Sequence, residues 1–164
     1  MAKHREEKTN VMRTLEQRGI PYAAHAYPHE EGVAVDGVTV ARSMGQDPEQ
    51  VFKTLVARGA SGGICVFVIP VAETLDLKKA ARAVREKSVE LVAVKEINAL
   101  TGYVRGGCSP IGMKKQYPTV FHETAEIVDS IFVSAGKIGL QVELAPAALL
   151  DLVGAATADL TVPD

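Results

Sequence analysis

Hydrophobic residues recur along this chain with two periods, one typical of helices and the other typical of strands. The clearest helical pattern is Leu77, Ala80, Ala81 and Val84, which fall on one face of a helix with Asp76 at its N-cap. Glycine or proline bounds most of the other helical patterns. These predict a helix that begins after Thr9 or Asn10 and stops at Gly19, helices at 38–44 and 94–100, a brief helix that starts at Asp47-Pro48, and a last helix from Pro146 to Gly154.

Runs of apolar and β-branched residues lie between these helices and predict strands. Residues 51–57 and 64–69 flank a glycine loop at 59–63, so an antiparallel pair is expected there. Further strands are expected at 22–27, 119–121, 131–133 and 140–144. Together these elements predict a mixed α/β fold, with a mixed, largely antiparallel and partly barrel-like sheet surrounded by helices.

Length and composition suit a single domain spanning residues 1–164, with residues 1–8 expected to be flexible. The formal net charge of −2 argues against extensive coating of nucleic acid, which requires many phosphate-neutralising side chains. The charged N-terminal residues are not expected to be a signal peptide, and no apolar run reaches the ~18 residues of a membrane span. Two cysteines without paired spacing suit a reducing compartment, so a cytoplasmic protein is expected.

Residues 101–118, TGYVRGGCSPIGMKKQYP, contain four glycines and two adjacent lysines. Glycine lets a backbone approach a ligand closely, and the lysines suggest a nearby anionic group. A plain surface loop is the alternative interpretation. A second glycine turn, SAGKIG, covers residues 134–139. Neither turn is a Walker P-loop, because neither has the GxxxxG spacing followed directly by lysine and then serine or threonine.

Lys53 is a candidate for chemistry, because it interrupts the otherwise apolar segment VFKTLVA. It either lies on an exposed face of the strand or points into a cleft, where a desolvated lysine can bind phosphate or act at a shifted pKa. No metal or other cofactor is expected. His25 and His29 are four residues apart, but Pro28 disfavours the helix that would bring them together.

Four segments in this order resemble the YbaK/EbsC family of aminoacyl-tRNA deacylases, relatives of the editing domain of bacterial prolyl-tRNA synthetases. The segments are DPEQVFKTL from Asp47, PVA from Pro70 with LDLKK from Leu75, TGYVRGGCSPIG from Thr101, and VSAGKIGL from Val133. The resemblance implies a small mixed α/β fold whose cleft receives the charged 3′ end of a tRNA. It also implies release of a wrong amino acid, most typically cysteine carried by a proline tRNA.

The resemblance implies roles for individual residues. Lys53 matches the family's essential lysine, and the backbone of Gly106 and Gly107 would line the amino-acid pocket. Tyr27 and Ser134 match a tyrosine and a serine that would align the ester. The other predicted contacts are Ser109 and Gly136 with the substrate, and Lys114, Lys115 and Lys137 with the tRNA.

An aminoacyl ester is already activated, so positioning and charge stabilisation can supply much of the acceleration without a protein nucleophile. In cysteine-specific members the resemblance implies attack by the substrate's own thiol, and attack by water is the alternative. Cys108 and Gln141 depart from the cysteine-specific pattern, which has an aliphatic residue and an aspartate at these positions. Editing of alanyl- or seryl-tRNA therefore stays open, as does a non-catalytic module that binds tRNA ends or nucleotides. Prolyl-tRNA synthetase is a candidate partner.

Overall fold

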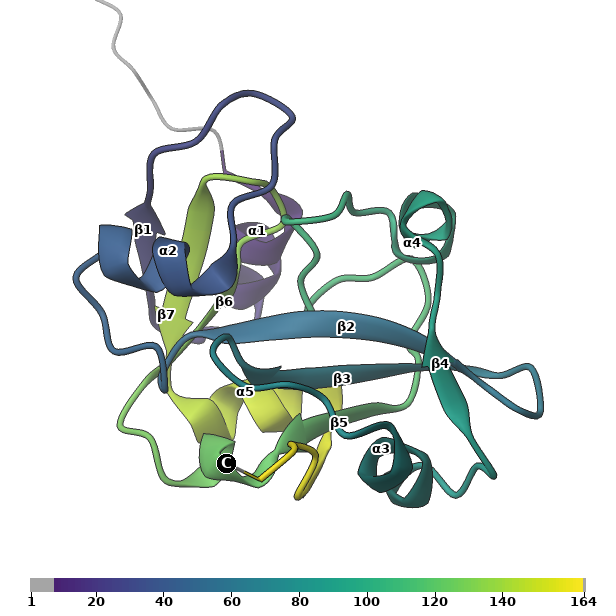
Figure 1. Ribbon diagram of the computed structural model, residues 1–164. Coiled ribbons are helices and arrows are strands. Elements are labelled where there is room, and N and C mark those ends of the chain that lie inside the picture. The colour runs from purple at the N-terminus through teal and green to yellow at the C-terminus, as the bar shows by residue number, and fades with distance from the viewer. Residues whose placement is uncertain (1–7, 164) are drawn as a thin grey trace, which may run out of the picture.

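A computed structural model describes residues 8–163, which form two β-sheets with helices around them (Figure 1). Residues 1–7 and 164 lie outside the described residues, and the flexibility expected of the N-terminus falls almost entirely on them. The helices are α1 (Asn10–Gln17), α2 (Gly37–Ser43), α3 (Leu77–Ala83), α4 (Val94–Thr101), the 3₁₀ helix η1 (Glu123–Glu126) and α5 (Pro146–Val153). The strands are β1 (Tyr22–Ala26), β2 (Phe52–Gly59), β3 (Ile64–Pro70), β4 (Val89–Leu91), β5 (Thr119–His122), β6 (Ile131–Ser134), β7 (Leu140–Leu144) and β8 (Ala156–Ala158).

The larger sheet has five strands in the order β4-β2-β3-β5-β8. Its centre is the antiparallel hairpin of β2 and β3, in which Phe52 pairs with Pro70 and Arg58 with Ile64. β4 extends the antiparallel part, whereas β5 and β8 add in parallel. The sheet is therefore mixed, as the apolar and β-branched runs predict.

The smaller sheet is antiparallel, in the order β1-β7-β6. It meets the larger sheet through a single parallel bridge between Val51 and Phe132, where the Phe132 amide donates to the Gln50 carbonyl at 2.9 Å. The strands therefore form two joined sheets, and the expected partial barrel is not closed.

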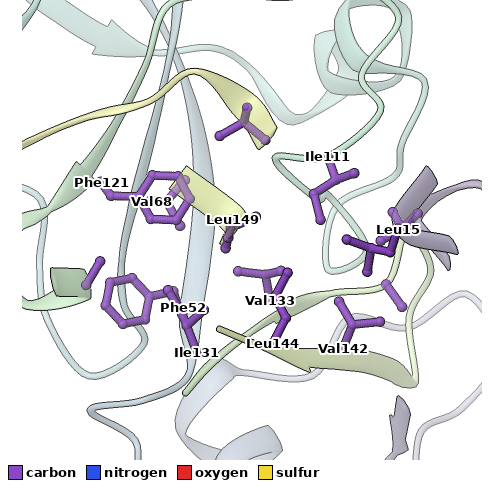
Figure 2. Close-up of a cluster of buried hydrophobic side chains, with 14 of the residues drawn as sticks. Leu15, Phe52, Val68, Ile111, Phe121, Ile131, Val133, Val142, Leu144 and Leu149 are labelled. Carbon is purple, nitrogen blue, oxygen red and sulfur yellow. The ribbon is translucent and has the colours of Figure 1, made fainter. Parts of the chain in front are cut away.

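The main hydrophobic core lies between the two sheets and is completed by α1 and α5. Figure 2 shows Phe52 and Phe121 from the larger sheet near Ile131 and Val133 of β6, with Leu149 of α5 beside them. A second cluster covers the other face of the larger sheet, where α3 packs. Apolar burial on both faces explains why β3 is apolar at nearly every position.

The predicted helices after Thr9 and after Asp76 are confirmed, together with their caps. The Thr9 hydroxyl accepts from the Met12 amide at 3.2 Å, and the Asp76 carboxylate accepts from the amides of Lys78 and Lys79. The remaining predicted helices are confirmed as well, except for one. In the described residues no helix is long and apolar enough to cross a membrane.

The brief helix predicted at Asp47-Pro48 is wrong, because residues 48–50 form a turn. The Asp47 carbonyl accepts from the Gln50 amide at 2.9 Å, and the Asp47 carboxylate accepts from the Glu49 amide at the same distance. The next residue, Val51, already bridges to β6, so the chain has no length for a helix. No distinct sequence pattern predicts β4, β8 or η1.

Phe121→Ala should lower the free energy of unfolding by about 3–5 kcal/mol, because the fully buried ring would leave a cavity between the two sheets. Urea denaturation followed by circular dichroism measures this change. Ile127→Ala is the matched control, since its side chain is 79% exposed and its loss should change the free energy by no more than about 0.5 kcal/mol. Similar losses for both variants would contradict the described core.

Candidate active site

A gap in the strand pairing of β2 creates the principal pocket of the described residues. β3 pairs with β2 along its whole length, but on the other edge β4 covers only Ala57–Gly59. Among the described residues, β6 joins that edge through one isolated bridge, at Val51. In Figure 1, β3 lies below β2 and no strand lies directly above the middle of β2. A pocket of about 380 Å³ opens along residues 51–55 of this uncovered edge.

Four further parts of the chain complete the pocket wall. They are the end of β1 with the loop and α2 after it, Val71 after β3, the glycine loop 101–118, and the β6–β7 region. The lining residues outside 51–55 are Tyr27, Ala34, Val35, Asp36, Gly37, Val40, Val71, Arg105, Gly106, Cys108, Ser134 and Gln141. The pocket therefore brings together segments from nearly every predicted motif.

Lys53 lies at the pocket and is half-buried. Burial lowers the pKa of its amine, because desolvation disfavours the charged form, while the carboxylates of Asp36 and Glu73 partly oppose this shift. The sequence allows Lys53 to lie on an exposed face of the strand or to point into a cleft. The structure places it at the cleft. A partly desolvated cation binds an anionic group more strongly than a fully solvated one.

Asp36 lines the pocket and also caps α2. Its carboxylate accepts hydrogen bonds from the Thr39 hydroxyl and from the amides of Val38 and Thr39. These bonds hold the pKa of Asp36 below its usual value, and the bond from the Thr39 hydroxyl contributes most. Asp36 is thus a fixed negative charge near Lys53, and no sequence motif indicated it.

The two glycine turns are hydrogen-bonded to each other through Ser134, a lining residue of the pocket. The Ser134 hydroxyl donates to the Gly107 carbonyl at 2.9 Å and accepts from the Gly136 amide at 3.0 Å. A Cβ at Gly107 would lie 2.9 Å from the Lys137 Cα, so only glycine lets the two backbones approach this closely. Ser134 lines the pocket, whereas Gly107 and Gly136 are not among its lining residues.

Gly106 and Tyr27 both line the pocket. Gly106 has a φ of +87°, and a Cβ there would come within 2.7 Å of the Ala34 Cβ. The loop before α2 therefore closes on the glycine loop. Tyr27 is buried, and its amide donates to the Gly139 carbonyl at 2.9 Å, which ties it to the second glycine turn.

The other predicted contacts lie away from the pocket lining. Ser109 is fully buried and accepts from the Ile111 amide at 3.3 Å, as a turn-stabilising serine does. Lys114, Lys115 and Lys137 are exposed outside the lining, and the Lys114 amine lies 3.5 Å from the Ala99 carbonyl. Arg105 is the cation of the glycine loop that lines the pocket. Its position directly before Gly106 and Gly107 is the sequence feature that could have identified it as a pocket residue.

Cys108 and Gln141, the two departures from the family pattern, both line the pocket. Burial raises the pKa of the Cys108 thiol to about 11, so the thiol is neutral near pH 7. Because the thiolate is the nucleophilic form, Cys108 acts as a small apolar part of the pocket wall. The amide oxygen of Gln141 is buried without a hydrogen-bond partner among the described residues. Both side chains are therefore placed to affect which ligand fits the pocket.

Within residues 8–163, one group of side chains has the spacing of a metal site: His122, Glu123 and Asp159. It lies outside the pocket lining. The His122 Nδ1 accepts from the Leu160 amide at 3.1 Å, so that nitrogen already anchors the C-terminal segment. His122 therefore serves to hold the C-terminal segment, and the three side chains are not part of the pocket.

Gly107→Ala should destabilise the protein by about 1–3 kcal/mol, because the new methyl group would be forced against the backbone of the second glycine turn. Gly63→Ala is the matched control, since the nearest atom to a Cβ there is 3.7 Å away. Urea denaturation of both variants measures the difference. Equal free energies of unfolding would show that the two turns do not depend on this close approach.

Lys53→Met should make the folded protein more stable at neutral pH, because it removes the partial desolvation of a charge. In wild type, the unfolded state holds more protons than the folded state between the lowered pKa and the ordinary lysine pKa of about 10.4. Wild-type stability should therefore rise relative to the variant as the pH increases through that window. Urea denaturation at several pH values tests this, with Lys87→Met, at an exposed position, as the control.

Comparison with known proteins matches residues 32–152 to the aminoacyl-tRNA editing domain. A relative from Enterococcus faecalis, EbsC, assigned as a Cys-tRNA(Pro)/Cys-tRNA(Cys) deacylase, is 47% identical over 162 residues, which cover 98% of each chain. A solved structure assigned as a trans-editing enzyme for prolyl-tRNA synthetase is 27% identical, with a TM-score of 0.80 over 93% of this chain and 95% of that one.

A solved hypothetical protein has the same fold, with a TM-score of 0.83, 22% identity, and coverage of 94% of this chain and 100% of that one. The family resemblance carried by the four sequence segments is thus confirmed by an independent match along most of the chain. The chain belongs to the aminoacyl-tRNA editing domain family.

Proposed function

We propose that this protein is a trans-acting aminoacyl-tRNA deacylase that removes a wrong amino acid, cysteine first, from tRNA. Family membership and the full-length similarity to EbsC, assigned as a Cys-tRNA(Pro)/Cys-tRNA(Cys) deacylase, support this activity. All of residues 1–164 would act as one editing domain, in the cytoplasm, where charged tRNA is present. The reaction needs no cofactor, because the ester bond is already activated.

The observation that carries this proposal is the position of Lys53. Its half-buried amine lies in a pocket whose wall also contains Tyr27, Gly106 and Ser134, although the four residues come from separate segments. The pocket is large enough for a small amino acid and part of a ribose. A site for the end of a charged tRNA needs this combination of a cation and a small, partly apolar recess.

Each of these residues has a distinct role in the proposed reaction. Lys53 binds the terminal phosphate or ribose region and stabilises the charge that develops on the ester. Tyr27 and Ser134 align the ester, and the Gly106 carbonyl accepts from the α-ammonium. Gly107 and Gly136 act indirectly, since they hold the Ser134 hydroxyl in place. Ser109 stabilises the glycine loop.

The cations around the pocket would contact the tRNA at increasing distance from the ester. Arg105 lies at the pocket, and Lys114, Lys115 and Lys137 are exposed beyond it, where they would meet the acceptor stem. A protein with a net charge of −2 makes few such contacts. Selectivity among tRNAs would then come from a partner, and prolyl-tRNA synthetase is the candidate.

Wild-type protein should release free tRNA from Cys-tRNA(Pro) faster than from Ala-, Ser- or Pro-tRNA(Pro). Lys53→Ala should reduce kcat/KM for Cys-tRNA(Pro) on the order of 10²–10³-fold, the loss typical of one electrostatic stabiliser. Acid-gel separation of charged and free tRNA measures both rates.

Lys87→Ala is the matched control, because this exposed lysine lies outside the pocket lining. Equal rates for wild type and Lys53→Ala would refute the assignment of Lys53, and no release from any charged tRNA would favour a non-catalytic module. Blocking the sulfur of the cysteine by methylation separates the two routes. Unchanged turnover would favour water as the nucleophile, and lost turnover would favour the substrate thiol.

A further inference from the structure

The main chain of Thr54 presents an unpaired donor and an unpaired acceptor to the pocket. In an antiparallel pair, successive residues direct their N–H and C=O groups alternately toward and away from the partner strand. Two bonds at the ends of the hairpin define the alternation here, from the Val71 amide to the Val51 carbonyl and from the Gly59 amide to the Gly63 carbonyl, both at 2.8 Å. Odd-numbered residues of β2 therefore bond to β3.

Even-numbered residues of β2 direct their main-chain groups to the opposite edge. Two observations agree with this alternation. Pro70, which has no N–H, stands opposite Phe52, and the Val56 carbonyl accepts from the Val92 amide, beside β4, at 3.0 Å. The N–H and C=O groups of Thr54 consequently point away from β3, into the stretch between the β6 bridge and β4.

In residues 8–163 the hydrogen bonds outside regular strand pairing include none from the Thr54 amide or to its carbonyl. On this edge the β6 bridge ends at Val51, and β4 begins to pair at Ala57. Thr54 lines the pocket and is half-buried, although its hydroxyl oxygen is fully buried. The accessible part of Thr54 therefore lies in the rest of the residue, which includes its main chain.

An extended amino acid has the complementary arrangement. Its nitrogen and its carbonyl oxygen point to the same side, so it can exchange two hydrogen bonds with one residue of a strand edge, as hydrogen-bonded antiparallel pairs do. Peptides add to open sheet edges in this way. A single aminoacyl group fits the gap, because Thr54 directs both of its main-chain groups into it, between the bridge at Val51 and the β4 contact at the Val56 carbonyl.

We propose that the aminoacyl group of the substrate pairs with Thr54 as a one-residue strand, and that the Thr54 amide is a catalytic oxyanion donor. The Thr54 carbonyl accepts from the α-ammonium, and the Thr54 amide donates to the ester carbonyl oxygen. This assignment rests on the proposed deacylase function and adds to it a second group, beside Lys53, that stabilises the transition state. Lys53, the preceding residue, adds positive charge to the same pocket.

The reaction would proceed through a charged oxygen at this amide. Water, or the thiol sulfur of cysteine, bonds to the carbonyl carbon and loses a proton, while the electron pair of the C=O π bond moves to oxygen. When the carbonyl re-forms, the bond to the ribose oxygen breaks and that oxygen takes up a proton. The products are free tRNA and either the amino acid or its thiolactone.

Replacement of an amide by an ester in the protein backbone tests the donor without removing a side chain. The α-hydroxy analogue of valine at position 54 should lower kcat/KM for Cys-tRNA(Pro) on the order of 10²–10³-fold relative to Thr54→Val, from which it differs only by N–H to O. The same analogue at position 56 removes the next amide of this edge, outside the pocket lining, and should change kcat/KM little relative to wild type. Equal losses at both positions, or none at position 54, would overturn the proposal.

Hydrogen exchange gives a readout that does not need turnover. The Thr54 amide should exchange rapidly in the free full-length protein and slowly with a stable analogue, cysteine joined by an amide bond to 3′-amino-3′-deoxyadenosine. Slow exchange in the free protein, or no protection on binding, would count against edge pairing.

A tRNA that carries 3-mercaptopropionate lacks only the amino group, and its release as fast as cysteine would refute the role of the Thr54 carbonyl. If wild type releases no amino acid from any tRNA, the proposed function fails, while the exchange measurement still decides whether the edge binds an aminoacyl group.

Discussion

The site depends on one main-chain bridge, between Val51 and Phe132, which joins the two sheets. Strands twist relative to one another, so β6 can follow β2 for only a short distance before it diverges toward β7. The divergence leaves an uncovered edge, and the loops of the smaller sheet close over it to form the pocket wall. A continuous barrel would have paired this edge and left no room for a ligand. The absence of closure is thus what makes the fold useful.

The pocket also shows how stability and function oppose one another in a small domain. Lys53 is partly desolvated in the folded state, although Asp36 and Glu73 reduce the resulting loss of stability. The buried amide oxygen of Gln141 lacks a partner among the described residues. Both groups are unfavourable in the free protein, and a ligand that supplies a negative charge to Lys53 and a hydrogen-bond donor to Gln141 would offset this cost. The hydrophobic clusters on either face of β2 and β3 supply the stability that tolerates them.

Local patterns predicted most of the helices and strands, because capping residues such as Thr9 and Asp76 and the apolar periodicity act over a few residues. They could not predict that the strands divide into two sheets, since this depends on contacts such as Val51 with Phe132, which are 81 residues apart. The pocket residues likewise fall into two groups, those that the sequence indicates and those that only the folded structure brings there. Resemblance placed Lys53 and Ser134 in it, but Asp36 and Arg105 reach the pocket only through the folding of their loops, which no local motif records.

The contact between Gly107 and the Lys137 backbone has a consequence for how this protein could diversify. Two loops joined through their main chains form a rigid frame, and a change in the length of either would have to be matched by the other. Side chains that project from this frame into the pocket, such as Cys108, are not under that restriction. New specificities would therefore arise by exchange of single side chains within an unchanged backbone. A library for altering the substrate should accordingly vary Cys108 and Gln141 and leave both turns intact.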